Sequence, residues 1–428
     1  MNIFKHVILL FSLAAPAAGL AAQSLEECRR LAREHYPEIR QYDLISRTEK
    51  YDLSNAAKAW IPQVAVSGQA TWQSDVVEYP EAFSKILAQQ GVSIPGMRKD
   101  QYKVAVDVSQ TIWDGGQSKA SRALAEAEAA EERGRVDVNL YDLRSRIDNL
   151  YFGILLLDEK VSLTEAKISL LESNLSRMRS YSKNGVAMQS DADAIEAELL
   201  TARQSLGQAT SSRASYRRML EIFIGRPLDD GKLEKPAMPE VASRVSARPE
   251  LSLFDAGRAE LDARRRAVKS SLSPRFSAFA QGYYGYPGLD MFKSMMSADW
   301  RLNAIVGVKM SWNIGAFYTK RNNLGKIDAA ARRIDVQRDE FLFNSRLQIE
   351  EYDSEITRLR DAVADDDRIV ELRRSVRVAA ESQLANGVID ATDLLRKITD
   401  ESSAEMARST HEIELLQTVY RLKHTLNQ

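Results

Sequence analysis

The side chains that most often catalyse reactions or bind metals are few in this chain and poorly spaced. The 428 residues include four histidines and one cysteine. His411-Glu412 begins like a zinc-protease helix but lacks the second histidine of that motif. No histidine has metal-ligand spacing with Cys28, and no phosphate loop or activated nucleophile is found. We therefore expect no enzyme activity, no cofactor and no metal.

The single Cys28 cannot form a disulfide within the chain. The preceding Ser24-Leu25-Glu26-Glu27 lacks the small and apolar residues that a lipidation signal requires, so we place Cys28 on a first helix. Whether Cys28 is modified stays open.

Two short segments have the composition of tight turns between helices. Each joins an asparagine to a glycine, a pair suited to a left-handed helix stop. Asp191 and the segment from Asp390 to Asp393 follow them and suit helix N-caps. The turn segments are Asn184-Gly185-Val186 and Asn386-Gly387-Val388.

These turns require long helices on both sides. No proline occurs between residues 117 and 183, and apolar residues there recur every three or four positions, which predicts a coiled-coil seam. We predict helical hairpins over 117–225 and 316–427, separated by a proline-containing connector at 226–247. A helix of 67 residues reaches roughly 100 Å. The first seam comprises Val136, Leu140, Leu143, Ile147, Leu150, Ile154, Leu157 and Val161.

The chain repeats itself. Pro37 and Pro62 recur as Pro249 and Pro274 with the same offset of 212 residues, and the turn segment Asn184-Gly185-Val186 recurs as Asn386-Gly387-Val388. A tandem duplication of this length defines the organisation of the whole chain. We predict a first repeat over 23–225 and a second over 248–428, each with a helix, two strands and a long hairpin.

Four segments alternate between apolar and polar residues. They cover 62–72, 102–113, 274–286 and 300–312, although Phe279 interrupts the polar side of the third. Such alternation is typical of membrane-barrel strands and equally of half-buried strands in soluble proteins. The tryptophans favour the membrane, because all five lie at the ends of these segments, as in an interfacial aromatic girdle. They are Trp60, Trp72, Trp113, Trp300 and Trp312.

Four strands cannot close a barrel, which needs about eight. An open edge in lipid leaves backbone groups unpaired, at several kcal/mol for each group. If the strands span a membrane, several copies of the chain must share one barrel.

The composition agrees with an exported protein that has no nucleic-acid partner. Charge is balanced, with 59 basic and 60 acidic residues, so no basic field is available for nucleic acid. Residues 1–22 resemble a signal peptide, with Lys5 before an apolar run and small residues after it. No later segment has about 18 unbroken apolar residues, so we expect no transmembrane helix.

Several motifs of the chain belong to one pattern: Tyr36-Pro37-Glu38, the Pro62 and Pro274 strand entries, and the strand exits Trp113-Asp114-Gly115 and Trp312-Asn313-Ile314-Gly315. Together with the hairpin turns, these motifs resemble the TolC family of outer-membrane efflux proteins. The resemblance covers nearly the whole mature chain.

The resemblance implies a mainly α fold with membrane β strands: a tandem-duplicated TolC-like α-helical barrel and a trimeric, 12-stranded β-barrel with four strands per chain. It implies a homotrimer in the outer membrane of a Gram-negative cell that extends into the periplasm. The trimer would be a passive exit channel for tripartite efflux or type I secretion, docked on a periplasmic adaptor and an inner-membrane transporter.

The family's control point is the periplasmic tip, where acidic rings narrow the pore. By position, Asp191, Asp390 and Asp393 become candidates for this constriction, although capping would also explain them. Arg396 stands where some relatives have a second acid, which puts a paired acidic ring in doubt. The resemblance also assigns adaptor contact to both turn segments.

The alternative function is a periplasmic coiled-coil adaptor or scaffold that forms no pore. Such a protein is expected to have one hairpin flanked by small glycine-rich β domains.

Overall fold

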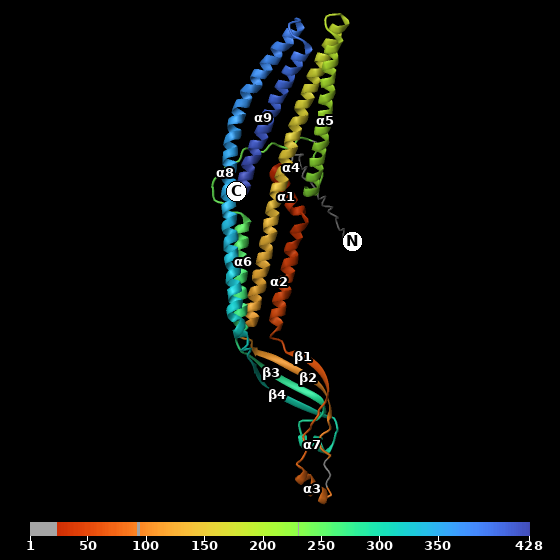
Figure 1. The fold of residues 1–428 in the computed structure, drawn as a ribbon, viewed down its shortest axis with the longest axis vertical. Coiled ribbons are helices and arrows are strands. Elements are labelled where there is room, and N and C mark those ends of the chain that lie inside the picture. The colour runs from red at the N-terminus through yellow and green to blue at the C-terminus, as the bar shows by residue number, and fades with distance from the viewer. Residues whose placement is uncertain (1–23, 92–94, 230) are drawn as a thin grey trace, which may run out of the picture. The chain divides into compact units, whose positions relative to one another are not determined.

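Four long helices form two hairpins (Figure 1). The computed structural model describes residues 24–91, 95–229 and 231–428, so the expected signal peptide lies outside the described residues. Helix α4 (Gln117–Lys183) has 67 residues and pairs with α5 (Gln189–Ile224), whereas α8 (Ala316–Ala385) has 70 and pairs with α9 (Ala391–Leu426). The apolar seam produces this arrangement, since Leu140, Ile147 and Ile154 are all buried.

Both hairpins turn through the same backbone device. Gly185 and Gly387 have φ of +73° and +70°, the left-handed region in which glycine is unstrained. The following residue then closes the helix end, with Val186 N–H donating to Tyr181 O and Val388 N–H to Gln383 O, both at 2.9 Å. This six-to-one bond satisfies carbonyl groups that a helix end would otherwise leave unpaired.

The described residues divide into two compact units. One unit contains those of 1–39, 137–249 and 341–428, and the other contains those of 40–136 and 250–340. Helices α4 and α8 contribute residues to both units.

The first unit contains α1 (Leu25–His35), α5, α9 and the C-terminal parts of α4 and α8. It also contains most of the short helix η1 (Pro37–Arg40), because the unit boundary follows Ile39. Its main apolar cluster takes side chains from all four long helices, so the two hairpins pack on each other. Cys28 of α1 is fully buried. The cluster consists of Leu171, Leu175, Met178, Ala192, Ile195, Leu199, Ala202, Ala380, Ala391, Leu394 and Ile398.

The second unit contains one antiparallel sheet in the order β1-β2-β3-β4. The four strands span Gln63–Trp72, Asp100–Trp113, Arg275–Tyr286 and Arg301–Ser311. Helices α2 (Gln41–Lys58) and α6 (Pro249–Ser270) precede β1 and β3. Two short helices that the sequence did not predict, α3 (Glu81–Gln89) and α7 (Met291–Met296), lie in the loops between paired strands.

Candidate functional site

One face of the sheet is apolar. Side chains alternate between faces along a strand, and residues paired across antiparallel strands share a face. The register pairs Val66 with Val106, and Val306 with Ala280, on the same side. Leu302 is 81% exposed and Val306 77%. We call this surface the apolar face; it comprises Val64, Val66, Tyr102, Val104, Val106, Val108, Phe276, Tyr284, Leu302, Val306, Val308 and Met310.

An exposed apolar surface of this extent marks contact with a membrane or with another protein. Aromatic rings cluster at both of its ends. Next to the interstrand loops, the Trp300 ring lies 6.1 Å from Tyr102 and 5.5 Å from Tyr284, measured between centroids. At the opposite end, the centroid of Trp113 lies 5.9 Å from that of Phe276.

All five tryptophans are exposed. Trp60 and Trp72 flank β1, and Trp312 follows β4 with its Nε1–H donating to Leu272 O at 2.9 Å. Exposed amphipathic rings at both ends of apolar strands suit the boundary between lipid and water.

A β-bulge directs Trp113 to the apolar face. The pairing of β2 with β3 shifts register between Thr111 and Trp113, so that Thr111 faces Ser277 and Trp113 faces Phe276. In a regular strand without the bulge, strict alternation would place Trp113 on the same side as Asp107 and Thr111. Bulges commonly redirect a side chain in this way.

The opposite surface, the polar face, carries a hydrogen-bonded network across three strands. Gln281 Nε2 donates to Asp107 Oδ1 at 2.5 Å, and Lys103 Nζ donates to Gln281 Oε1 at 3.0 Å. Ser67 Oγ lies 3.5 Å from Asp107 Oδ2. The sheet therefore separates an apolar surface from a polar one, as a strand between lipid and water must.

Phe279 interrupts the polar face, as the sequence indicates. Its ring lies over Gly307 of β4, where an added Cβ would stand 3.0 Å from the ring. The missing side chain at Gly307 therefore makes room for Phe279.

At the first hairpin tip, Asp191 is the third residue of α5 and not its N-cap. The N-cap is Met188, whose backbone N–H donates to Asp191 Oδ2 at 3.1 Å. Asp191 thus satisfies one of the free N–H groups at this helix start. Val186 and Met188 are both exposed in the turn.

At the second tip, Asp390 is the N-cap of α9, and its carboxylate accepts from Asp393 N–H at 2.8 Å. Arg396 lies one turn further along α9 and is exposed. Within the part of the chain that the structure describes, neither Arg396 nor the Asp393 carboxylate forms an ion pair. Asp393 and Arg396 are three residues apart, so they are neighbours on the helix surface.

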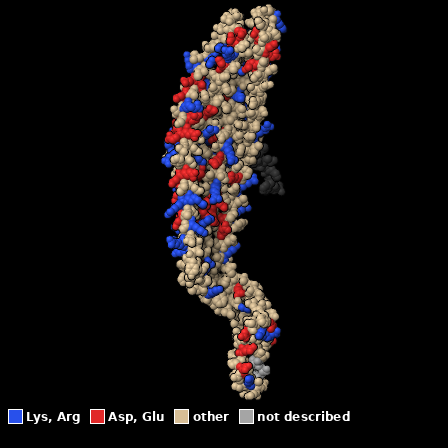
Figure 2. All heavy atoms as spheres, viewed as in Figure 1, with Lys and Arg blue, Asp and Glu red and all other residues tan. Residues whose placement is uncertain are grey.

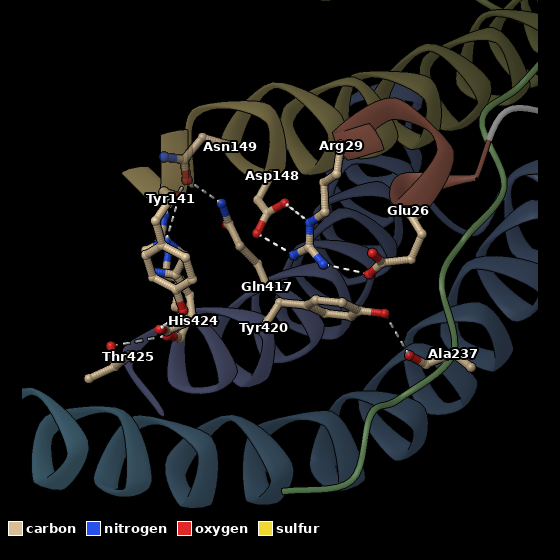
Figure 3. A network of polar contacts seen from close by, with 11 residues as sticks. Glu26, Arg29, Tyr141, Asp148, Asn149, Ala237, Gln417, Tyr420, His424 and Thr425 are labelled. Atoms are coloured by element: carbon tan, nitrogen blue, oxygen red, sulfur yellow. Dashed lines mark hydrogen bonds and ion pairs between the residues drawn. The ribbon is translucent and has the colours of Figure 1, made fainter. Parts of the chain in front are cut away.

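Sequence reasoning missed a buried polar network that joins α1, α4 and α9 (Figure 3). Arg29 binds Asp148 through both carboxylate oxygens, at 2.7 and 2.5 Å. Its guanidinium also lies 5.3 Å from the centre of the Tyr420 ring. The available signal was Asp148 itself, a charged residue beside the apolar seam position Ile147.

In the same network His424 stacks on Tyr141 with 4.3 Å between ring centroids. The Tyr141 hydroxyl donates to His424 O, and His424 Nε2 lies 3.2 Å from Tyr141 O. Burial, together with Arg248, Arg144 and Arg29, lowers the pKa of His424 to about 4. His424 is therefore neutral at neutral pH and can donate through Nε2–H.

In the described ranges, no helix combines the length and apolar character needed to cross a membrane. Those ranges also contain no group of three or more potential His, Cys, Asp or Glu metal ligands.

The comparisons agree with this geometry. Residues 29–226 match the model of the outer membrane efflux protein family. The whole chain is similar in structure to the outer membrane protein VceC of Vibrio cholerae, with a TM-score of 0.70 and 12% identity over 94% of this chain and 95% of that one. No curated protein sequence matches.

Two outer membrane channels show the same fold. MtrE of Neisseria gonorrhoeae, in its open state, has a TM-score of 0.67 and 16% identity over 95% of this chain and 89% of that one. CmeC of Campylobacter jejuni has a TM-score of 0.67 and 11% identity over 100% and 93%.

Residues 29–226 thus resemble the outer membrane efflux protein family, and the chain has the TolC-like fold that its sequence predicts.

Proposed function

We propose that this chain acts as a passive homotrimeric conduit that carries solutes from the periplasm to the cell exterior. The observation that carries the proposal is the four-stranded sheet with an exposed apolar face. Its edge strands, β1 and β4, have no further partner strand among the described residues. Closure requires about eight strands, and three chains would supply twelve.

The N-terminal signal would export the chain, and the helical hairpins would extend into the periplasm. There the turn segments 184–186 and 386–388 would contact a periplasmic adaptor linked to an inner-membrane pump. In type I secretion the channel would likewise bind a periplasmic adaptor that is linked to an inner-membrane transporter. The exposed Val186 and Val388 support such a contact, because each turn presents an apolar side chain to solvent.

The hairpin tips would form the pore constriction, with Asp191, Asp390, Asp393 and Arg396 as its charged residues. The Asp390 carboxylate is already used as a cap, which leaves Asp393 and Arg396 to face the pore. We expect Asp393→Ala combined with Arg396→Ala to raise single-channel conductance in planar bilayers. Unchanged conductance would indicate that these residues only stabilise the helix end and do not line the pore.

The trimer is tested by cross-linking the edge strands. Ser67→Cys on β1 with Ile305→Cys on β4, treated with a bifunctional maleimide in native outer membranes, should give covalent dimers and trimers and nothing larger. The control pair Ser109→Cys and Ser277→Cys lies on the inner strands β2 and β3 and should give no cross-linked chains. Cys28 is buried, and burial raises the pKa of its thiol to about 11, so it should not react.

The alternative, a periplasmic adaptor or scaffold without a pore, predicts a different result. The protein would then fractionate with soluble periplasm, and the edge cysteines would give no trimer.

A further inference from the structure

The polar face of the sheet is strongly basic. Its strand residues include four cations, Lys103, Arg275, Arg301 and Lys309, against the single acid Asp107. The net charge is therefore +3 per chain on this surface. We propose that the polar face lines an exit lumen that attracts anions, so that the cargo of this channel is anionic. This inference rests on the proposed trimeric conduit.

The one acid is largely occupied. Asp107 accepts from Gln281 and lies beside Ser67. Lys103 donates to the same Gln281, and its ammonium lies 4.6 Å from the centre of the Tyr283 ring. Lys103 and Asp107 are thus linked through Gln281 and offset each other in net charge, which leaves the other three cations as the excess positive charge.

Those three cations have no ion pair among the residues that the structure describes. Arg275 donates to the neutral Gln117 at 2.9 Å. Arg301 acts electrostatically on Asp290, but Asp290 already pairs with Lys293 at 3.3 Å. Lys309 is exposed. Like charges on one wall of a water-filled passage with low-dielectric sides concentrate the counter-ion.

Two of the cations share a row across the sheet. Lys103 pairs with Gly285, and Gly285 pairs with Arg301. Gly285 has no side chain, so the row places two cations on either side of bare backbone, about 10 Å apart at two strand spacings. The row thus places two positively charged residues at the loop end of the polar face.

The loop that contains α7 is hydrogen-bonded to this part of the polar face. Leu289 N–H donates to Asn303 Oδ1 at 2.8 Å, and the Tyr283 hydroxyl donates to Pro287 O at 3.4 Å. Asn303 and Tyr283 form the next row after Arg301, and Tyr283 is buried. The loop therefore lies against the polar face beside the row of Arg301, and charges on this face act over about 8 Å at physiological salt.

Charge on the helices differs. Figure 2 shows acidic and basic side chains interspersed over the helical surface in view, with no field of one sign. The excess of cations on the polar face is therefore not a consequence of overall composition, which is balanced.

The test is the ion selectivity of the intact trimer in a planar bilayer with a potassium chloride gradient. We expect chloride to be preferred over potassium. Arg301→Gln with Lys309→Gln should shift the reversal potential towards potassium, whereas the control Lys85→Gln, in α3 outside the strands, should not. Conductance with a cation preference, or no shift in the double variant, would overturn the inference and leave the conduit intact. A trimer without any conductance would instead overturn the proposed function.

A second measurement uses a polyanion directly. Tripolyphosphate added on the loop side should block the current, while hexaamminecobalt(III) should not. The Arg301→Gln variant removes three positive charges from a trimer, so it should need more tripolyphosphate for the same block. Equal block by the two ions would contradict an anion-attracting lumen.

Discussion

At the residue scale, Gly185 and Gly387 are required by backbone conformation alone. Among the described residues, no atom lies within 4 Å of the position that a Cβ would occupy at either glycine. A substitution there therefore tests strain without steric conflict. The same two positions were predictable from sequence, because Asn-Gly after a long periodic segment has few structural uses other than a helix stop.

Gly387→Ala should destabilise the second hairpin tip by about 1 kcal/mol, the typical cost of a left-handed conformation for a residue with a Cβ. Hydrogen exchange of the Val388 amide should then accelerate. Gly325→Ala is the control, because Gly325 is an exposed helical residue in α8 with free space around it. That substitution should stabilise the helix, typically by up to 1 kcal/mol. If both substitutions changed stability equally, the left-handed conformation of Gly387 would not be the reason for its glycine.

His424 should make stability depend on pH. Its pKa is about 4 in the folded chain against 6.5 as the ordinary value, so between these values the unfolded chain binds more protons. The His424 contribution is complete above pH 6.5 and is lost as the pH falls towards 4, up to about 3 kcal/mol. His424→Phe keeps an aromatic ring against Tyr141 and removes the titration. Denaturant unfolding from pH 4 to 7 should then show a smaller slope of unfolding free energy in the variant.

At the scale of elements, we expect the two faces of β4 to differ in how well they tolerate a charged side chain. An arginine facing lipid near the middle of a membrane strand typically costs about 2–4 kcal/mol. Val306→Arg, on the apolar face, should therefore prevent accumulation of the trimer in outer membranes. Its neighbour Ile305→Arg, on the polar face, should accumulate like the natural protein. The comparison is made by immunoblot of membrane fractions, and equal loss in both variants would argue against this orientation of the sheet.

The spacing of apolar residues predicted the main elements. Apolar residues recur every two positions in the strands and every three or four positions in the helices. Local exceptions could not be predicted. The bulge at Ile112 depends on pairing with β3, and the room for Phe279 depends on Gly307 of the neighbouring strand. Helices α3 and α7 are only 9 and 6 residues long, too short for a periodic signal.

The site residues show the same limit. The sequence offered Asp191 as a possible cap, but the structure uses Met188 as the N-cap and Asp191 three residues later. Several adjacent residues could occupy the cap, and the choice depends on where the turn ends. The Arg29–Asp148 pair joins residues 119 positions apart, and no local pattern connects them.

At the scale of the whole molecule, thermal stability should depend on protein concentration. The backbone groups at the two sheet edges can form hydrogen bonds only with another subunit. Binding of that subunit should therefore stabilise the folded chain as a ligand would. In detergent, the Tm should rise as the protein is concentrated. Leu394→Ala, which opens a cavity in the cluster shared by the hairpins, should lower the Tm and keep the concentration dependence. A Tm independent of concentration in the natural protein would indicate a self-sufficient monomer.

The pairing of β2 with β3 joins the two repeats that the sequence predicts. An ancestor with one repeat per polypeptide would have reached the same number of strands only as a hexamer. Gene fusion halves the number of chains that must assemble, from six to three. It also lets the two halves specialise: β1 and β2 carry one acid and one cation on the polar face, whereas β3 and β4 carry three cations and no acid. An ion crossing such a ring of six alternating hairpins would meet threefold, not sixfold, electrostatic symmetry.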